Sequence, residues 1–249
     1  MGLKLTTFYS KYKINNKKLV KKKILVIPVF LAIAFIVGMI FVFGGFKNAI
    51  WIDECKMYFV VADSNLSNSH AENLKSRVED AGGSGVVADI GEYKNCVVIL
   101  SYLNENDAEK IKNNCLSMFP NTQVLCIKSS RIRKNSQIKN NFVVQETLRF
   151  IIDNKYESLE NILKFEKGDL NFSKLYEYGY KLKASIEKYY KMLGDSELEV
   201  RLRLTLSKLQ IILNAFLQNN LVGEFSSTEF KKYIVTLMLE EKSLREIFI

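Results

Sequence analysis

Four cysteines are the residues of this 249-residue chain best suited to covalent chemistry, and all of them lie between positions 55 and 126. An even number of cysteines is typical of disulfide bonds in proteins outside the cytoplasm. In the fold predicted below, Cys96 can meet Cys115 and Cys55 can meet Cys126, although buried free thiols would give the same sequence. We therefore treat 96–115 and 55–126 as candidate disulfides, with free thiols as the alternative.

The sequence lacks the common patterns of metal and catalytic sites. Its cysteines are 41, 19 and 11 residues apart, and His70 is the single histidine, so we expect no zinc site. There is no G-x-S-x-G motif for a serine hydrolase, and no carboxylate pair stands out for glycoside cleavage. Residues 82–85, Gly-Gly-Ser-Gly, lack the Lys-Ser/Thr ending of a phosphate-binding loop. We expect a protein that is not an enzyme and uses no metal or cofactor, with His70 solvated at a helix start.

The formal charge of +9 is concentrated at one end of the chain. The first 23 residues contain eight lysines and no acid, so the remainder carries 28 basic and 27 acidic side chains. A nucleic-acid-binding domain needs a dense basic surface on a folded face, whereas the dense basic run here adjoins an apolar stretch. We therefore expect no nucleic-acid partner.

Residues 24–44 form an uncharged apolar run that matches a transmembrane helix. At about 1.5 Å rise per residue it spans roughly 31 Å, close to the hydrocarbon thickness of a bilayer. A cleaved signal peptide and a buried core helix are the alternatives, but a signal peptide has a shorter apolar region. We assign 1–23 to a basic cytoplasmic tail and 24–45 to a retained single-pass helix in the cell membrane, with later domains extracytoplasmic. Ala34 and Gly38 form a small-xxx-small pair that can seat a second helix, so a homo-oligomer is also open.

Residues 56–129 have the pattern of a small α+β domain. Strands are predicted at 57–62, 86–90, 95–101 and 123–128 from their apolar, β-branched composition. One helix is predicted from a capping box of Ser69 with Glu72, and a second from the cap Asn104. The order βαββαβ predicts a ferredoxin-like fold, with two helices on one face of a four-stranded antiparallel sheet.

Several short segments of this domain resemble the SPOR family of bacterial envelope modules. They are Tyr58-Phe59-Val60-Val61-Ala62, Asn68-Ser69-His70-Ala71-Glu72, Tyr93 before an apolar strand, and Asn104-Glu105-Asn106-Asp107-Ala108. The resemblance covers 57–129 and implies peptidoglycan binding and a role in cell division or sporulation. Val61, Asp63 and Ser101 stand where that family often has Gln, Gly and Gly. The ligand-contacting residues that the resemblance implies are Val61, Ser64, Tyr93, Ser101 and Tyr102.

Strand alternation predicts that both faces of the sheet are apolar. If Val60, Ala62, Cys96, Val98 and Leu100 face the two helices, then Phe59, Val61, Val97 and Ile99 lie on the opposite face. Such a face suits protein better than sugar, so we expect it to be covered by the C-terminal helices or by a partner chain. Partial shielding by loops is the alternative.

The remaining residues predict a basic linker at 130–140 and an all-α helical bundle at 141–249. Apolar residues recur at spacings of four and three, and helices are predicted near 142–153, 156–166, 173–193, 196–220 and 226–247. Capping boxes Ser196-x-x-Glu199 and Ser226-x-x-Glu229 mark two helix starts. Five tyrosines on one helix are expected at the rim of the core, with a partner-binding groove as the alternative; they are Tyr176, Tyr178, Tyr180, Tyr189 and Tyr190.

Together these features predict a single-pass envelope protein without catalytic activity. Its expected partner is peptidoglycan glycan, bound through the SPOR-like domain. The alternative is an envelope scaffold that binds another protein through the apolar sheet face or the helical bundle, without glycan recognition.

Overall fold

The computed structural model describes residues 50–133, 138, 141–219 and 226–247. The predicted cytoplasmic tail and the transmembrane helix at 24–45 lie outside these residues. Within the described part of the chain, no helix combines the length and the apolar character needed to cross a bilayer.

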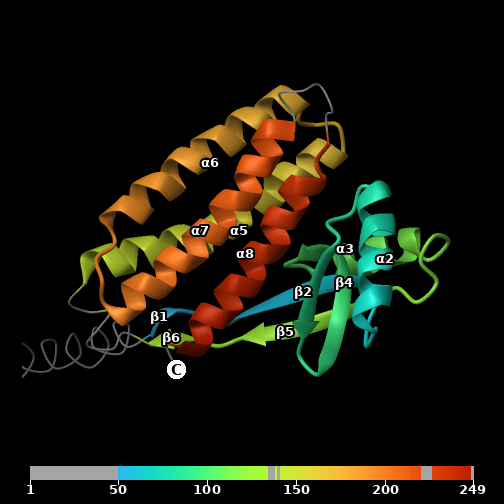
Figure 1. Ribbon diagram of the computed structural model, residues 1–249, viewed down its shortest axis with the longest axis horizontal. Coiled ribbons are helices and arrows are strands. Elements are labelled where there is room, and N and C mark those ends of the chain that lie inside the picture. The colour runs from blue at the N-terminus through green and yellow to red at the C-terminus, as the bar shows by residue number, and fades with distance from the viewer. Residues whose placement is uncertain (1–49, 134–137, 139–140, 220–225, 248–249) are drawn as a thin grey trace, which may run out of the picture. The chain divides into compact units, whose positions relative to one another are not determined.

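The first half of the described chain forms a four-stranded antiparallel sheet with two helices (Figure 1). The strands are β2 (Cys55–Asp63), β3 (Val86–Ile90), β4 (Tyr93–Tyr102) and β5 (Gln123–Ser129), and they lie side by side in the order β3-β4-β2-β5. The helices are α2 (Asn68–Asp80) and α3 (Glu105–Cys115). The predicted βαββαβ order is therefore confirmed.

Side-chain caps set the starts of α2 and α3. Asn104 caps α3 as predicted, because its side chain accepts a hydrogen bond from the backbone of Asn106. The cap of α2 is Ser67, which accepts from the backbone N–H of His70, so the helix begins earlier than the predicted box at Ser69. His70 lies in the first turn and is exposed, as expected.

Two short strands lie outside the four-stranded sheet, β1 (Ile50–Ile52) and β6 (Ile132–Arg133). β6 falls within the predicted linker at 130–140. Ile132 and Ile138 are fully buried, and the carbonyl of Ser130 accepts a hydrogen bond from Arg245. Two described residues of this segment are therefore buried, whereas the side chains of Ser130 and Arg131 are exposed.

Four long helices form the bundle: α5 (Phe142–Glu166), α6 (Phe172–Met192), α7 (Glu197–Asn219) and α8 (Thr228–Ile247). The sequence predicted two helices where α5 is continuous. The boundary between the two predicted helices falls at Asn154 and Lys155, and both side chains are buried in the bundle with partners described below. Gly179 of α6 lets Phe216 of α7 approach closely, since an added Cβ would come within 2.8 Å of the Phe216 ring.

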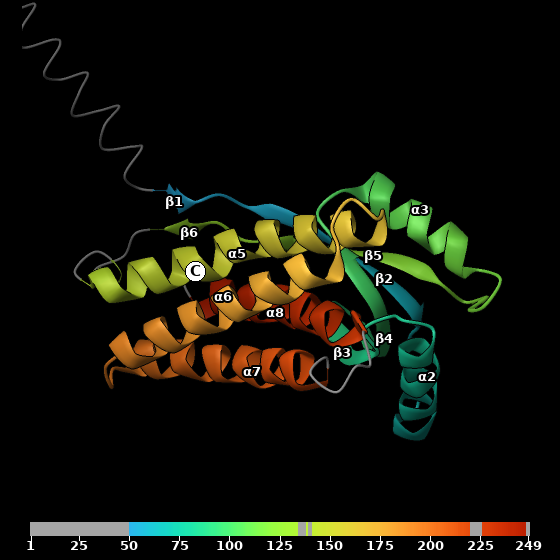
Figure 2. The ribbon, with the colours of Figure 1, turned by 90° about the horizontal axis from the view of Figure 1, so that it is seen from above.

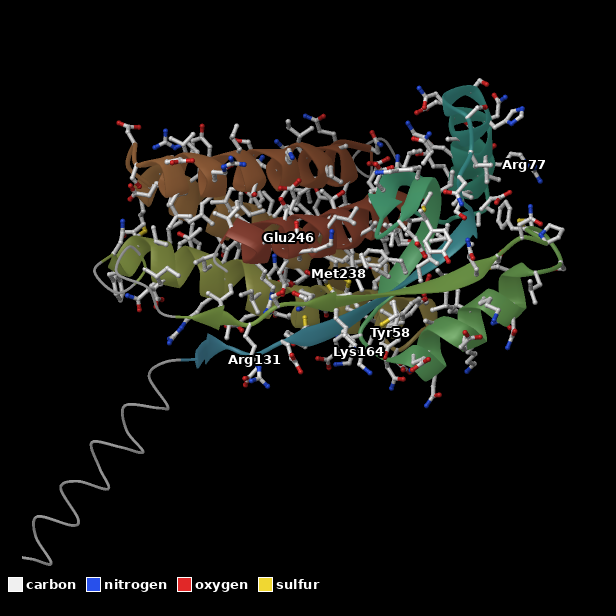
Figure 3. The ribbon with its side chains drawn as sticks, turned by 90° about the horizontal axis from the view of Figure 1, so that it is seen from below. Tyr58, Arg77, Arg131, Lys164, Met238 and Glu246 are labelled. Carbon is white, nitrogen blue, oxygen red and sulfur yellow. The ribbon has the colours of Figure 1, made fainter. Side chains whose placement is uncertain are left out.

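The second face of the sheet is covered by α8. Helix α8 contacts β3 and β4, whereas α2 and α3 pack on the other side (Figure 2). Phe59 and Val61 are fully buried, and α8 buries Ile234 and Met238, the second of which is labelled in Figure 3. Coverage by the C-terminal helices is therefore confirmed, and the sheet face is not free for a partner.

Strict alternation along the strands is wrong near the middle of β4. The pairing between β2 and β4 shifts between Val60 and Val61 and again between Val61 and Asp63. Ile99, expected on the α8 side, lies instead beside Gly83 and near Val78 of α2. A register shift of this kind moves side chains between faces, and no composition signal marks it.

Candidate functional site

Most of the ligand residues predicted on the sheet lie in the hydrophobic interior. Val61 and Ser101 have no exposed surface, and Tyr102 is 1% exposed. Because α8 covers one face and the helices α2 and α3 cover the other, these three residues cannot contact a glycan. The sheet-based ligand site predicted from the SPOR resemblance is wrong for them.

Ser64 and Tyr93 are the two predicted ligand residues that remain partly exposed. The Ser64 hydroxyl accepts a hydrogen bond from Gln123 at 2.6 Å, and the adjoining Asn65 backbone donates to Lys94 beside Tyr93. The structure therefore brings Ser64 and Tyr93 to one end of the sheet. Tyr102 lies at the far end of β4, so the five residues do not form one site.

All four cysteines are free, and neither predicted disulfide is present. On the β2–β5 ladder Cys55 is opposite Ser129 while Cys126 is opposite Tyr58, which separates the two by about 10 Å along the strands. Cys115 lies close enough to Tyr102 to contribute to its raised pKa. Tyr102 is at the opposite end of β4 from Cys96. Both separations exceed the reach of a disulfide.

Two of the thiols lie in environments that favour their neutral form. Burial raises the pKa of the Cys96 thiol and of the Cys115 thiol above the ordinary value, which favours the neutral, weakly nucleophilic form. Cys126 is exposed on β5, and Cys55 is half-buried at the start of β2. The reactive candidates are therefore Cys55 and Cys126.

A groove between α5 and α6, lined by polar and apolar side chains, is a candidate binding site. Its volume is about 470 Å³, within the usual range for small-ligand sites. The α5 wall carries Glu146, Asp153 and Glu157, whose spacings of seven and four residues place them on one helix face. These three carboxylates form no ion pair with another described residue. Lys181 on the α6 wall is paired with Glu177 at 2.7 Å.

The floor of the groove is a buried network centred on Asn154, which is 4% exposed. Its amide nitrogen donates to the hydroxyl of Tyr233, and its oxygen accepts from Ser158 at 2.8 Å and from Tyr178 at 3.1 Å. Burial raises the pKa of both tyrosines, so both hydroxyls stay neutral. Since every polar group of Asn154 is used, the network fixes the Tyr178 side chain at the groove surface.

One part of the groove is aromatic. Phe150 of α5 and Tyr189 of α6 stack with ring centroids 4.7 Å apart, and both rings line the groove. Tyr178 and Tyr189 are thus the members of the predicted tyrosine cluster that line it. Tyr176 packs on Phe216 in the core, while Tyr180 is 64% exposed. The groove offers an aromatic surface beside carboxylates that form no ion pair with a described residue.

A separate ionic cluster is buried between α5 and α8. Lys155, Glu241 and Arg245 are each at most 1% exposed. The Lys155 ammonium lies 2.8 Å from Oε2 of Glu241, and a guanidinium nitrogen of Arg245 lies 2.7 Å from Oε1. Lys155 Nζ also contacts Sγ of Cys55 at 3.4 Å. The carboxylate therefore neutralises one of two buried cations.

Sequence reasoning missed both the network and the cluster. Lys155 stands at a core position between Leu148, Ile151 and Leu159, and Glu241 stands likewise between Leu237 and Leu244. The signal that could have revealed the cluster was a pair of opposite charges, each at a core position on the apolar face of a different helix. The predicted helices instead ended at 153 and began again at 156.

No protein-family model matches this chain, and comparison with curated proteins and with solved structures gives no significant match. The role of the groove therefore has to be inferred from its own residues.

Proposed function

We propose that this chain is a single-pass envelope protein without catalytic activity, which binds peptidoglycan glycan at the α5–α6 groove. The expected transmembrane helix at 24–45 anchors it, and the domain from Cys55 onward lies outside the cytoplasm. The βαββαβ domain is a SPOR-like module whose sheet serves as a support for α8. The associated role is in cell division or sporulation.

The groove is the observation that carries the proposal. It places three carboxylates, which form no ion pair with a described residue, and Arg149 beside a stacked aromatic pair, over a floor of neutral hydroxyls. Carboxylate oxygens accept hydrogen bonds from sugar hydroxyl and acetamido N–H groups. An aromatic ring provides the apolar surface for the C–H face of a sugar ring. Asp153, Glu157 and Tyr189 are therefore the residues expected to contact the glycan.

A sedimentation assay with purified peptidoglycan tests this function. The full chain in detergent should be retained in a saturable manner, and the double variant Asp153→Asn/Tyr189→Ala should bind about tenfold more weakly or worse, since a hydrogen bond to a charged group contributes roughly 1.5–3 kcal/mol. Asp169→Asn is the matched control, because this carboxylate is exposed outside the groove. Equal retention of the double variant and wild type would place the site elsewhere.

The second candidate function is an envelope scaffold that binds an amphipathic helix of another envelope protein. The observation that favours it is an exposed apolar row on α7, where Leu204 is 59% and Ile211 is 69% exposed. The scaffold would be favoured by two results together. The wild-type chain would not be retained by peptidoglycan, and the Leu204→Glu variant would lose a protein that co-purifies with wild type. The sheet face is not part of this candidate, because α8 occupies it.

A further inference from the structure

A thiol and an amine from distant parts of the chain meet at the edge of the buried ionic cluster. Lys155 is fully buried, and its Nζ lies 3.4 Å from Sγ of Cys55. The same nitrogen lies 2.9 Å from Oε1 and 2.8 Å from Oε2 of Glu241. Cys55 Sγ is itself 3.8 Å from Oε1 of Glu241. A sulfur nucleophile, an amine and a proton acceptor are therefore in mutual contact.

Arg245 holds this arrangement in place. Its Nε donates to Oε1 of Glu241 at 2.9 Å, and its Nη1 donates to the carbonyls of Asp53 and Ser130 at 2.7 and 2.8 Å. These bonds tie the carboxylate to the backbone beside Cys55. The three reacting groups are thus fixed by a buried side chain from α8.

We propose that Cys55 and Lys155 form a redox-sensitive pair, which a peroxide converts into a covalent sulfur–nitrogen cross-link. The thiol sulfur first takes one oxygen from the peroxide and becomes a sulfenic acid, and for hydrogen peroxide the other oxygen leaves as water. The sulfur is oxidised in this step and the peroxide is reduced.

The second step joins the two side chains without further oxidation. The Lys155 ammonium gives a proton to the Glu241 carboxylate, and the nitrogen lone pair attacks the sulfenic sulfur. The S–O bond breaks, and the hydroxyl leaves as a second water with a proton from the nitrogen. One thiol, one ammonium and one hydrogen peroxide thereby give one S–N bond, two waters and one proton, which passes from Glu241 to solvent.

The other cysteines provide internal comparisons. Cys126 is exposed and open to the same oxidant, and among the described residues it has no hydrogen bond to a lysine side chain. It should stop at oxygen-bearing acids, whereas Cys55 has the amine of Lys155 at 3.4 Å. The cross-link would connect residues 100 apart in sequence and join the start of β2 to the middle of α5.

Peptide mapping after peroxide treatment tests the proposal. The folded full chain in detergent is treated with hydrogen peroxide, digested without reductant, and mapped by mass spectrometry. The expected product is a peptide pair joining Cys55 to Lys155, two hydrogens lighter than the separate peptides, which disappears after thiol reduction. It should persist in Cys126→Ser and be lost in Cys55→Ser.

A second measurement keeps the proposal falsifiable if a variant loses its fold. In wild type, circular dichroism establishes that the chain is folded, and the cross-linked form should show a raised midpoint of thermal unfolding, because a long loop is closed. Sulfinic or sulfonic acid at Cys55 of the folded wild type, with Lys155 unmodified, would overturn the proposal. A cross-link from Cys55 to another cysteine would do the same.

Discussion

The sheet and the helical bundle bury different kinds of side chain. The interior of the sheet domain is apolar, and its buried polar side chains are hydroxyls such as Ser101 and Ser129. The bundle buries Lys155, Glu241 and Arg245 together with the amide of Asn154. Apolar burial stabilises roughly in proportion to area, whereas buried charge is costly unless each partner is present. The sheet therefore acts as an apolar support for α8, and the polar chemistry is concentrated in the bundle.

Removal of the carboxylate from the ionic cluster should have the largest effect. Glu241→Gln leaves Lys155 and Arg245 buried without their counter-ion, and loss of one partner from a buried ion pair costs about 3–5 kcal/mol. The free energy of unfolding from urea titration of the folded chain should fall by that amount. The variant should also lose the peroxide-dependent cross-link.

The neighbouring residue provides the control for this prediction. Glu240 is paired at 2.7 Å with Lys208, whose side chain is 60% exposed, while the Glu240 side chain is 18% exposed. Glu240→Gln should change stability by less than about 1 kcal/mol, because water screens Lys208 and the Gln side chain can still accept the hydrogen bond from Thr205. If the two variants were equally stable, the cluster would not differ from an ordinary surface pair.

An apolar truncation on α8 probes the sheet side of the comparison. Met238 is fully buried where α8 covers the sheet, so Met238→Ala should cost roughly 2–5 kcal/mol through lost transfer energy and a cavity. The loss should not depend on salt, since no charge is involved. A change below about 1 kcal/mol, measured by the same urea titration, would mean that α8 and the sheet are not one core.

The elements were largely predictable because their signals are local. Strand composition, the cap Asn104 and the box Ser196-x-x-Glu199 all lie within a few residues of the elements that they define. Coverage of the sheet face was also predictable, since an apolar face such as that of Phe59 and Val61 has to be buried by something.

The candidate site was not predictable, because it depends on pairing across helices. Asn154 finds its partner in Tyr233, and Lys155 finds its partner in Glu241, each about eighty residues away in sequence. A single sequence shows the polar residues without their partners, so it does not reveal which of them pair inside the bundle. The predicted disulfides failed for a related reason, since the β2–β5 register fixes which residues meet Cys55.

A pair of tyrosine variants sharpens the comparison at a smaller scale. Tyr233→Phe removes the acceptor of the Asn154 amide and leaves a buried donor unsatisfied, which costs about 1–3 kcal/mol. In the sheet, the buried hydroxyl of Tyr102 has no hydrogen-bond partner among the described residues. Tyr102→Phe should therefore be neutral or slightly stabilising. If Tyr233→Phe and Tyr102→Phe lost the same free energy of unfolding, the hydrogen bond between Tyr233 and Asn154 would not distinguish the bundle from the sheet.

The smallest expected effect concerns the cap of α7. The Glu199 carboxylate accepts from the hydroxyl and backbone of Ser196 and from Asn141, and these hydrogen bonds lower its pKa from 4.5 to about 2. A lowered pKa in the folded state stabilises the fold above pH 4.5, and this contribution is lost as the pH falls toward 2.

Ser196→Ala should cost about 0.5–2 kcal/mol near neutral pH. The difference in free energy of unfolding between Ser196→Ala and wild type should shrink as the pH falls from 4.5 to 2. Protonated Glu199 carries no charge, so it accepts more weakly from the donors of Ser196. Urea titrations across this range measure the difference, and a pH-independent loss would show that the cap acts without the Glu199 charge.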